Sequence, residues 1–336
     1  MITALAAPPA KPPAKPPATS SESNTDAAPD PSTKKSASRD LPAVISGGSD
    51  KNIKRWDASG KLVDTIGSLD DTVNVLHSLP NGDLISGGAD GLVKTFSGVS
   101  GQELKSFRAS RSAVASIAAS PDGKLLAVGT ADGEITLFNL RTGARLSDVA
   151  AHAGSVQALQ ITSDGSRLIS GSSDKTIRIW HIAGNLGPIE YKSNIAAHDD
   201  AVTAIAMAPG DGLIATVSAD GYLKTWHIDG GLVGRMKVCD RGVQSVAFSP
   251  DGKTIATGDN DGKVRLWNAQ TSAALPMTML HDKDRSVNAV AFAANGKILV
   301  SGGSDSTIRY WNLDNGQKLK SIAAHDGGVR ALLLTP

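Results

Sequence analysis

The chain has one cysteine, no long apolar run and few aromatic residues, and each of these features limits what it can be. Cys239 is alone among 336 residues, which excludes an internal disulfide framework and a metal site built from several cysteines. No stretch reaches the roughly 18 apolar residues of a membrane-spanning helix, and the first residues lack a basic leader followed by an apolar run. We therefore expect a cytoplasmic protein with no membrane segment and no cofactor, provided that Met1 is its natural start.

Neither sign of charge is in excess. The chain has 34 Lys and Arg and 33 Asp and Glu, and residues 1–42 hold five of the bases and four of the acids. The rest of the chain therefore carries 29 charges of each sign and no formal net charge. Because proteins that bind phosphate backbones present a basic surface, we expect no nucleic-acid partner.

The five tryptophans and two of the five phenylalanines recur at one position of a repeat. The stretch SGSSDKTIRIW at 170–180 has an aspartate six residues before its tryptophan, and all five tryptophans follow an aspartate at this distance. Phe96 and Phe138 end two further copies. The seven aspartates are Asp50, Asp90, Asp132, Asp174, Asp220, Asp261 and Asp305. Successive aspartates lie 40 to 46 residues apart, which is the period of a β-propeller blade.

Each repeat contains four segments with the pattern of short strands. The first, such as VQSVAF at 243–248, has apolar residues at near-alternate positions and ends in a tight turn such as SPDGK, which supplies the positive φ of a hairpin. A second strand, the aspartate turn, a third strand ending at the aromatic residue and a fourth strand follow. No segment has a sustained helical period, so the sequence predicts an all-β fold of four-stranded antiparallel blades.

The two ends of the repeat region complement each other. The region opens at a second strand, 43–47, and stops after a first strand, 329–334. The first strands begin at Val73, Val114, Val156, Val202, Val243, Val287 and Val329. An open array would leave unpaired strand edges at both ends. We therefore predict a seven-bladed propeller over 43–336 whose last blade is shared between the N- and C-termini.

Residues 1–42 differ in composition from the repeats. They are rich in Pro, Ala, Ser and Lys and include PPAKPPAKPPA at 8–18. Such a composition buries too little apolar surface to offset the entropy of ordering, so we predict a disordered tail or linker. The alternative is a polyproline II ligand for an aromatic groove in another protein.

With the aspartate turns and the strand-end tryptophans in place, residues 43–336 resemble the WD-repeat (WD40) β-propellers. A strict WD ending occurs only at Trp56 and Asp57. In this family a histidine before the first strand, a hydroxyl on the second, the turn aspartate and the tryptophan form a hydrogen-bonded set. The resemblance implies four sets: His152, Ser170, Asp174 and Trp180; His198, Thr216, Asp220 and Trp226; His281, Ser301, Asp305 and Trp311, with two extra loop residues; and His325 with Ser46, Asp50 and Trp56.

Three blades depart from this set. Leu69 with Phe96, Ser110 with Val128 and Phe138, and Cys239 with Trp267 mark the positions where it is broken. We expect these blades to depend more on packing.

The resemblance implies a noncatalytic, monomeric scaffold that presents one face to a protein or peptide partner. Family members that bind peptides contact them through residues flanking the leading residue of each first strand and through the residue before the turn aspartate. The matching candidates at the channel mouth are Asn74, Ser155, Gln157, Ser173, Thr203, Gln244, Asn260, Asn288, Ser304 and Arg330. Arg330 is the only charged side chain among them, and none is aromatic. We expect moderate affinity, or binding elsewhere on the rim, because binding hot spots favour aromatic anchors.

Recurrence of Ser, His and Asp raises the question of hydrolysis. A nucleophilic triad is a single constellation beside an oxyanion site, whereas these groups repeat from blade to blade together with a tryptophan. We therefore assign no catalytic residue. Two alternatives stay open: a propeller enzyme with a metal or acids bound in the channel, and the propeller module of a larger protein whose activity lies outside this chain.

Overall fold

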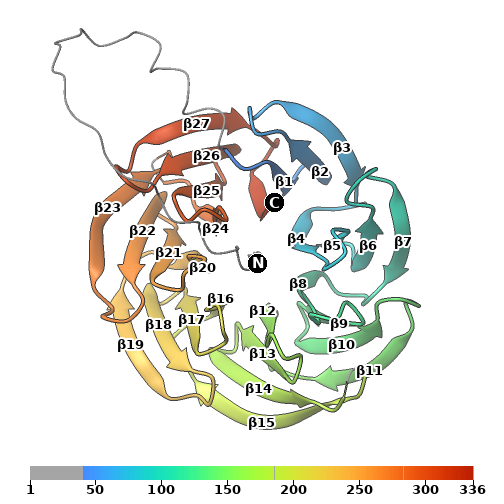
Figure 1. Cartoon of the computed structure of the whole chain (residues 1–336). Coiled ribbons are helices and arrows are strands. Elements are labelled where there is room, and N and C mark those ends of the chain that lie inside the picture. The colour runs from blue at the N-terminus through green and yellow to red at the C-terminus, as the bar shows by residue number, and fades with distance from the viewer. Residues whose placement is uncertain (1–40, 185, 283, 336) are drawn as a thin grey trace, which may run out of the picture.

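A computed structural model describes residues 41–184, 186–282 and 284–335, and there the chain forms a ring of seven four-stranded antiparallel sheets (Figure 1). The innermost strands are β4 (Val73–Ser78), β8 (Val114–Ala119), β12 (Val156–Ile161), β16 (Val202–Met207), β20 (Val243–Phe248), β24 (Val287–Phe292) and β28 (Val329–Leu334). The second strands are β1 (Val44–Gly48), β5 (Leu84–Gly88), β9 (Leu125–Thr130), β13 (Arg167–Ser172), β17 (Leu213–Ser218), β21 (Thr254–Asp259) and β25 (Ile298–Gly303).

The third and fourth strands complete each blade toward the rim. The third strands are β2 (Asn52–Trp56), β6 (Leu92–Phe96), β10 (Glu134–Asn139), β14 (Thr176–Ile182), β18 (Tyr222–His227), β22 (Lys263–Asn268) and β26 (Thr307–Asn312). The outermost are β3 (Leu62–Ser68), β7 (Glu103–Arg108), β11 (Arg145–Ala150), β15 (Ile189–Ala196), β19 (Leu232–Lys237), β23 (Ala274–Leu280) and β27 (Lys318–Ala323). The predicted all-β fold, the four-stranded blades and their number are confirmed.

Burial decreases from the centre of the ring to its rim, and the sequence follows this gradient. The second strands β1, β5, β9 and β25 are buried at every residue, because neighbouring blades cover both of their faces. The outermost strand β7 alternates between exposed and partly buried residues. Apolar and small residues therefore fill the inner strands, while Lys, Arg and Glu are placed on the rim.

Glycines in the second strands let the blades approach closely. A Cβ at Gly47 would lie 2.6 Å from Cγ1 of Val73 in the next blade, and one at Gly302 would lie 2.6 Å from Cγ1 of Val329. The valine that leads an innermost strand thus packs where the preceding blade has no side chain. These two contacts flank the blade made by β28, β1, β2 and β3.

That blade closes the ring, as the sequence predicted. β28 pairs with β1 in antiparallel register, with Val44 opposite Leu334 and Gly47 opposite Ala331. The two strands come from opposite ends of the chain and lie side by side at the channel wall (Figure 1). The backbone N–H of Thr335 donates to the carbonyl of Ala43 over 3.1 Å. One sheet thus joins both ends of the described chain.

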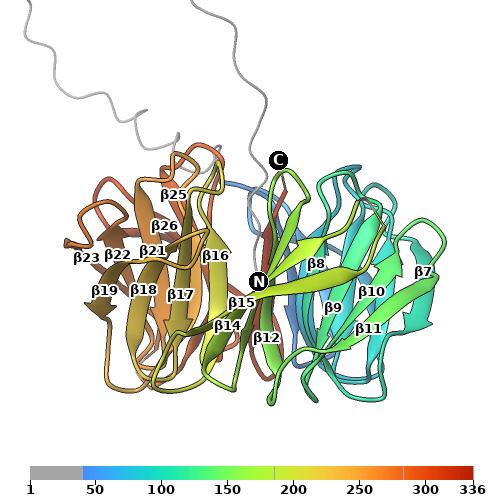
Figure 2. The same cartoon turned by 90° about the horizontal axis from the view of Figure 1, so that it is seen from below.

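The strands run between two faces of the disc (Figure 2). One face, which we call the Asp-turn face, carries the start of each innermost strand and the aspartate turns at 49–51, 89–91, 131–133, 173–175, 219–221, 260–262 and 304–306. The other, the hairpin-turn face, carries Ala43, Thr335 and the turns at 79–83, 120–124, 162–166, 208–212, 249–253 and 293–297. Antiparallel pairing fixes this division, because β4 starts opposite the end of β5.

The predicted tail at 1–42 lies almost wholly outside the described residues. Leu41, within that range, is buried and packs in a core cluster with Val44, Ala293 and Leu332. Within the described segments, no helix has the length and hydropathy needed to cross a membrane.

Candidate functional site

A buried series of hydrogen bonds joins a tryptophan, a hydroxyl, a histidine and an aspartate in one blade. Trp180 Nε1 donates to Ser170 Oγ over 2.9 Å, and Ser170 Oγ lies 2.8 Å from His152 Nε2. His152 Nδ1 lies 2.9 Å from a carboxylate oxygen of Asp174. An ionised carboxylate can only accept, so Nδ1–H donates to it and Nε2 accepts the serine proton. The tautomer of His152 is therefore defined, with Nδ1 as the donor and Nε2 as the acceptor.

Two further blades contain the same series. The structure brings together His198, Thr216, Asp220 and Trp226, and likewise His281, Ser301, Asp305 and Trp311. His281 precedes its aspartate by 24 residues, against 22 for His152, and still reaches it over 2.9 Å. The extra loop residues therefore leave the geometry of the set intact.

The fourth set connects the two ends of the chain. His325, just before β28, lies 2.7 Å from both Ser46 Oγ and Asp50 Oδ1. Trp56 Nε1 donates to Ser46 Oγ over 2.8 Å. Lys54 adds a salt bridge to Asp50 at 2.9 Å. The shared blade is thus held by side chains as well as by strand pairing.

Burial sets the charge state of these groups. It lowers the pKa of His152, His198 and His325 below the ordinary value of 6.5, although the adjacent aspartate acts in the opposite direction. Burial also opposes ionisation of Asp50, but hydrogen bonds from Lys54 and His325 outweigh it and lower the pKa to about 2. At neutral pH an ionised carboxylate therefore faces a neutral imidazole, as the hydrogen-bond directions require.

Two of the blades without a complete set differ from each other at the second-strand position that holds the hydroxyl in the complete sets. In the β4–β7 blade, Leu69 and Phe96 replace His and Trp, and Ser86 Oγ is buried with no hydrogen-bond partner among the described residues. In the β8–β11 blade the same position holds Val128, which has no polar group to satisfy. Ser86 is therefore the position where loss of the set leaves a buried hydroxyl unpaired.

The β20–β23 blade has an ion pair near this position. Asp259 is fully buried, and Arg265 Nη1 donates to one of its carboxylate oxygens. The other oxygen accepts backbone N–H bonds from Asp261 and Lys263 at 2.9 and 2.8 Å. Trp267 Nε1 still donates to the hydroxyl of the second strand, over 3.0 Å.

This blade also contains a group with the composition of a metal site. The ligand atoms of Cys239, Asp259 and Asp261 lie within 4.8 Å of one another. Both oxygens of Asp259 already accept hydrogen bonds, however, and burial raises the pKa of the Cys239 thiol. The group lies within a blade and not in the channel. It therefore offers few free ligands and does not match the predicted alternative of a channel-bound metal.

Side chains near the start of the innermost strands link neighbouring blades. Within the described part of the chain, five of them donate to the carbonyl of the valine that leads the next innermost strand. These bonds run from Asn74 to Val114, Ser116 to Val156, Thr203 to Val243, Ser245 to Val287 and Asn288 to Val329. Sequence reasoning placed Asn74, Thr203 and Asn288 at the channel mouth as partner contacts and did not detect these bonds. Through these bonds the three side chains fix the position of the next blade.

The structure places all ten predicted channel-mouth residues on the Asp-turn face, but with unequal exposure. Gln157 and Arg330 are exposed, whereas Ser155, Ser173, Thr203, Gln244, Asn260, Asn288, Ser304 and Asn74 are partly buried. Asn260 Nδ2 donates to the carbonyl of Arg241 over 2.6 Å, and Arg330 Nε donates to Ser49 Oγ over 3.1 Å. Gln157 and Arg330 follow their leading valines directly and make no bond to the next blade among the described residues. They are the side chains freest to meet a partner.

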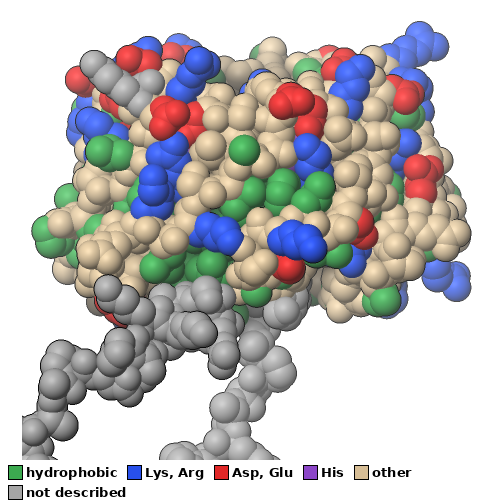
Figure 3. Space-filling model, turned by 90° about the horizontal axis from the view of Figure 1, so that it is seen from above, with side chains coloured by type: hydrophobic (Ala, Val, Ile, Leu, Met, Phe, Trp, Pro, Cys, Tyr) green, Lys and Arg blue, Asp and Glu red, His purple; other side chains and the backbone are tan. Residues whose placement is uncertain are grey.

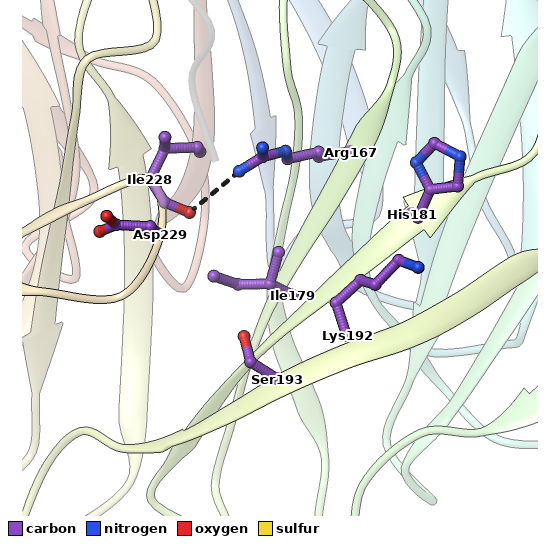
Figure 4. Close-up of a pocket in the computed structure, with 7 residues that line it drawn as sticks. All are labelled: Arg167, Ile179, His181, Lys192, Ser193, Ile228 and Asp229. Atoms are coloured by element: carbon purple, nitrogen blue, oxygen red, sulfur yellow. Dashed lines mark hydrogen bonds between the residues drawn. The ribbon is translucent and has the colours of Figure 1, made fainter.

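A pocket of about 300 Å³ opens toward the rim between the β12–β15 and β16–β19 blades (Figure 4). Arg167 points across it and donates to the carbonyl of Ile228 over 3.5 Å. His181 and Lys192 lie on the same blade as Arg167, and Asp229 follows Ile228 on the neighbouring blade. Charges of both signs face each other across this seam, so the pocket does not specify a ligand of one charge.

The outer wall of the disc has a mixed surface. Figure 3 shows Lys and Arg interspersed with Asp and Glu on the side that it views, with hydrophobic side chains between them. Exposed apolar residues on the outermost strands include Leu62, Val63, Leu104, Tyr191, Leu232 and Leu280. That side therefore has no extended patch of one charge.

Comparison with known proteins agrees with this architecture. The family model "WD domain, G-beta repeat" matches residues 231–268 and 276–312. A second model, "Nucleolar protein 10-like, N-terminal domain", matches residues 37–234, more than half of the chain. No curated protein sequence matches significantly. Among solved structures, the computationally designed Ika8 protein is similar, with 30% identity, 86% of each chain covered and a TM-score of 0.68.

Proposed function

Since this chain belongs to the WD-repeat β-propeller family, we propose that it is a noncatalytic scaffold that binds a protein or peptide on its Asp-turn face. Propellers of this family generally mediate protein interactions. The closed ring provides a rigid support, because each blade is fixed to the next by packing and, at five seams of the described chain, by a side-chain hydrogen bond to the valine that leads the next innermost strand.

The observation that carries this proposal is the set of polar side chains around the channel on that face. Gln157, Gln244 and Arg330 occupy the same strand position, and none of them bonds to the next blade in the described structure. Amide and guanidinium groups at this position suit the carbonyls and side chains of an extended peptide. Arg330 is the only charged side chain among the candidate residues around the channel, so they do not form the basic surface that a nucleic acid requires, which favours a peptide.

Burial of the hydroxyl and imidazole groups supports a noncatalytic role. The His152 side chain is fully buried, and Ser170 Oγ is occupied by bonds to Trp180 and His152. A nucleophile must reach the substrate and sit beside its base in an open site. The repeated sets therefore serve as structural locks of the blades.

Affinity capture with the immobilised full chain tests this proposal. We expect a Gln157→Ala, Arg330→Glu double variant to bind its specific partner with an affinity at least about tenfold lower than the wild type. Loss of about 1.4 kcal/mol or more at a hot spot has this effect. The matched control is Gln102→Ala, Lys318→Glu, which changes two exposed residues on other parts of the disc. Equal capture by both double variants would place the partner elsewhere.

Two further assignments belong to this proposal. The matching family model is named for a nucleolar protein, whereas the sequence predicts a cytoplasmic one, and imaging of the tagged full chain in its own cells distinguishes the two.

We expect a monomer because ring closure satisfies the inner strand edges. Light scattering of the purified chain at several concentrations tests this: a mass that rises toward a dimer would contradict it.

A further inference from the structure

The channel ends in an apolar cavity on the hairpin-turn face, opposite to the proposed partner face. The cavity has a volume of about 350 Å³ and is lined by the ends of six innermost strands and the turns that follow them. Its apolar lining includes Met207, Phe248, Phe292, Pro80, Pro121 and Pro250. This end of the channel thus differs in chemistry from the Asp-turn end, where amides and hydroxyls dominate.

One largely buried polar side chain in the cavity has no hydrogen-bond partner among the described residues. His77, at the penultimate position of β4, is only 8% exposed and makes no hydrogen bond to any described residue. Burial lowers its pKa to about 4, so the imidazole is neutral at pH 7 and carries one N–H donor. The ring nitrogens are not among the fully buried atoms that lack a partner, so they face the open cavity, where the N–H is available to a bound acceptor such as a carbonyl.

The wall of the cavity is incomplete at the blade where the chain enters the ring. Six innermost strands contribute to it, and among the described residues β28 does not. At this gap Ala43 pairs with Thr335 on the hairpin-turn face. Leu41 packs in one cluster with Ala293, the neighbour of the cavity residue Phe292. The 40 residues that precede Leu41 therefore join the disc beside the opening.

We propose that residues 8–17 of this same chain, PPAKPPAKPP, dock in the cavity as an extended segment. Proline-rich segments adopt polyproline II at low entropic cost and bind grooves lined by aromatic side chains, which Phe248 and Phe292 provide in this cavity. Their carbonyls accept hydrogen bonds, which provides a partner for the His77 N–H. The cavity lining includes the carboxylate of Asp211, whose charge is opposite to that of Lys11 and Lys15 in this segment.

Chain length permits this docking. A random coil of the 24 residues from 18 to 41 has a root-mean-square span of about 27 Å, enough to return to an opening beside Ala43. Tethering on this scale gives an effective concentration of about a millimolar. A segment that binds weakly as a free peptide is therefore largely bound as part of the chain. This inference is independent of the proposed partner face.

Photo-crosslinking in the full chain tests the docking. The photoreactive residue p-benzoylphenylalanine replaces Ala14, and mass spectrometry maps the products. We expect crosslinks within one copy to Met207 and to residues 248 and 292. Crosslinks between two copies, crosslinks confined to the Asp-turn face, or no crosslinks would each overturn the proposal.

Matched variants separate docking from simple proximity. Replacing Pro12, Pro13, Pro16 and Pro17 by serine keeps the tether length and leaves the propeller unchanged, and we expect the crosslink yield to fall at least about fivefold, as loss of specific binding requires. Met207→Lys should lower the yield similarly, whereas Met207→Leu should retain it, with melting temperature reporting that both variants fold. An unchanged yield in the serine variant would show that only the tether brings the segment near.

Discussion

At the scale of single residues, the hydroxyl on the second strand has opposite roles in two blades. Ser301 accepts from Trp311 at 2.7 Å and contacts His281 at 2.7 Å, whereas Ser86 is buried without a hydrogen bond among the described residues. We expect Ser301→Ala to lower the free energy of unfolding by about 1–3 kcal/mol, because it leaves the buried Trp311 N–H donor and the His281 Nε2 acceptor unpaired. Ser86→Ala should be neutral or stabilising. Chemical denaturation measures both, and equal losses would contradict this assignment.

The buried histidines make stability depend on pH. Burial lowers the pKa of His77, to about 4, and also that of His152, His198 and His325. In the unfolded chain these groups protonate near their ordinary pKa of 6.5, so the unfolded state binds more protons and stability falls as pH drops below that value. We expect the melting temperature to decrease from pH 7 to pH 5.

His77→Gln tests the share of one of these histidines. Between pH 7 and pH 5 the melting temperature of the variant should fall by less than that of the wild type. An identical pH profile for wild type and variant would show that His77 is not buried as described.

A second decline of the melting temperature begins below pH 3.8, the ordinary aspartate pKa, because Asp50 and Asp174 keep pKa values of about 2 in the folded protein.

At the scale of elements, the second strands need glycine where a valine of the next blade packs. Gly302→Ala would place a Cβ 2.6 Å from Val329 Cγ1, so we expect a loss of about 1–3 kcal/mol from overpacking. Gly212→Ala is the control, because a Cβ there meets nothing within 4 Å. Denaturation curves should separate the two variants, and the double variant Gly302→Ala, Val329→Ala should lose less than the sum of the two single losses, because the added Cβ then meets a smaller neighbour.

The elements were predictable from the sequence because each blade repeats one local pattern. The spacing of Asp305 and Trp311 marks the third strand, and the apolar leading residue of the first strand, such as Val287, is visible in the sequence as well. The bond from Asn288 to Val329 was not predictable, since it joins strands 41 residues apart across a seam. The apolar cavity was hidden for the same reason, because single turns such as the one at Pro250 reveal nothing of the ring that brings them together.

At the scale of the whole molecule, the ring depends on β28. This strand buries Val329, Ala331, Leu332 and Leu333, and burying each larger apolar side chain stabilises by about 1.5–3 kcal/mol. Deletion of residues 327–336 should therefore lower the melting temperature by at least about 10 °C, since a domain of this size shifts by about 2 °C per kcal/mol.

Deletion of residues 1–40 is the matching control for that truncation. It removes four times as many residues but leaves β1 and β28 in place, so we expect a much smaller shift of the melting temperature. Differential scanning calorimetry of the two truncated chains measures both shifts. Equal melting temperatures would contradict closure through a shared blade.

The adjacency of Ala43 and Thr335 also determines how this ring can be mounted. A polypeptide joined directly to Leu41, in place of residues 1–40, or to Thr335 would leave the disc from the hairpin-turn face. A short affinity tag at either of these two positions would therefore leave Gln157 and Arg330, on the opposite face, pointing away from the support. Immobilisation through either position should give the same accessible face in binding measurements.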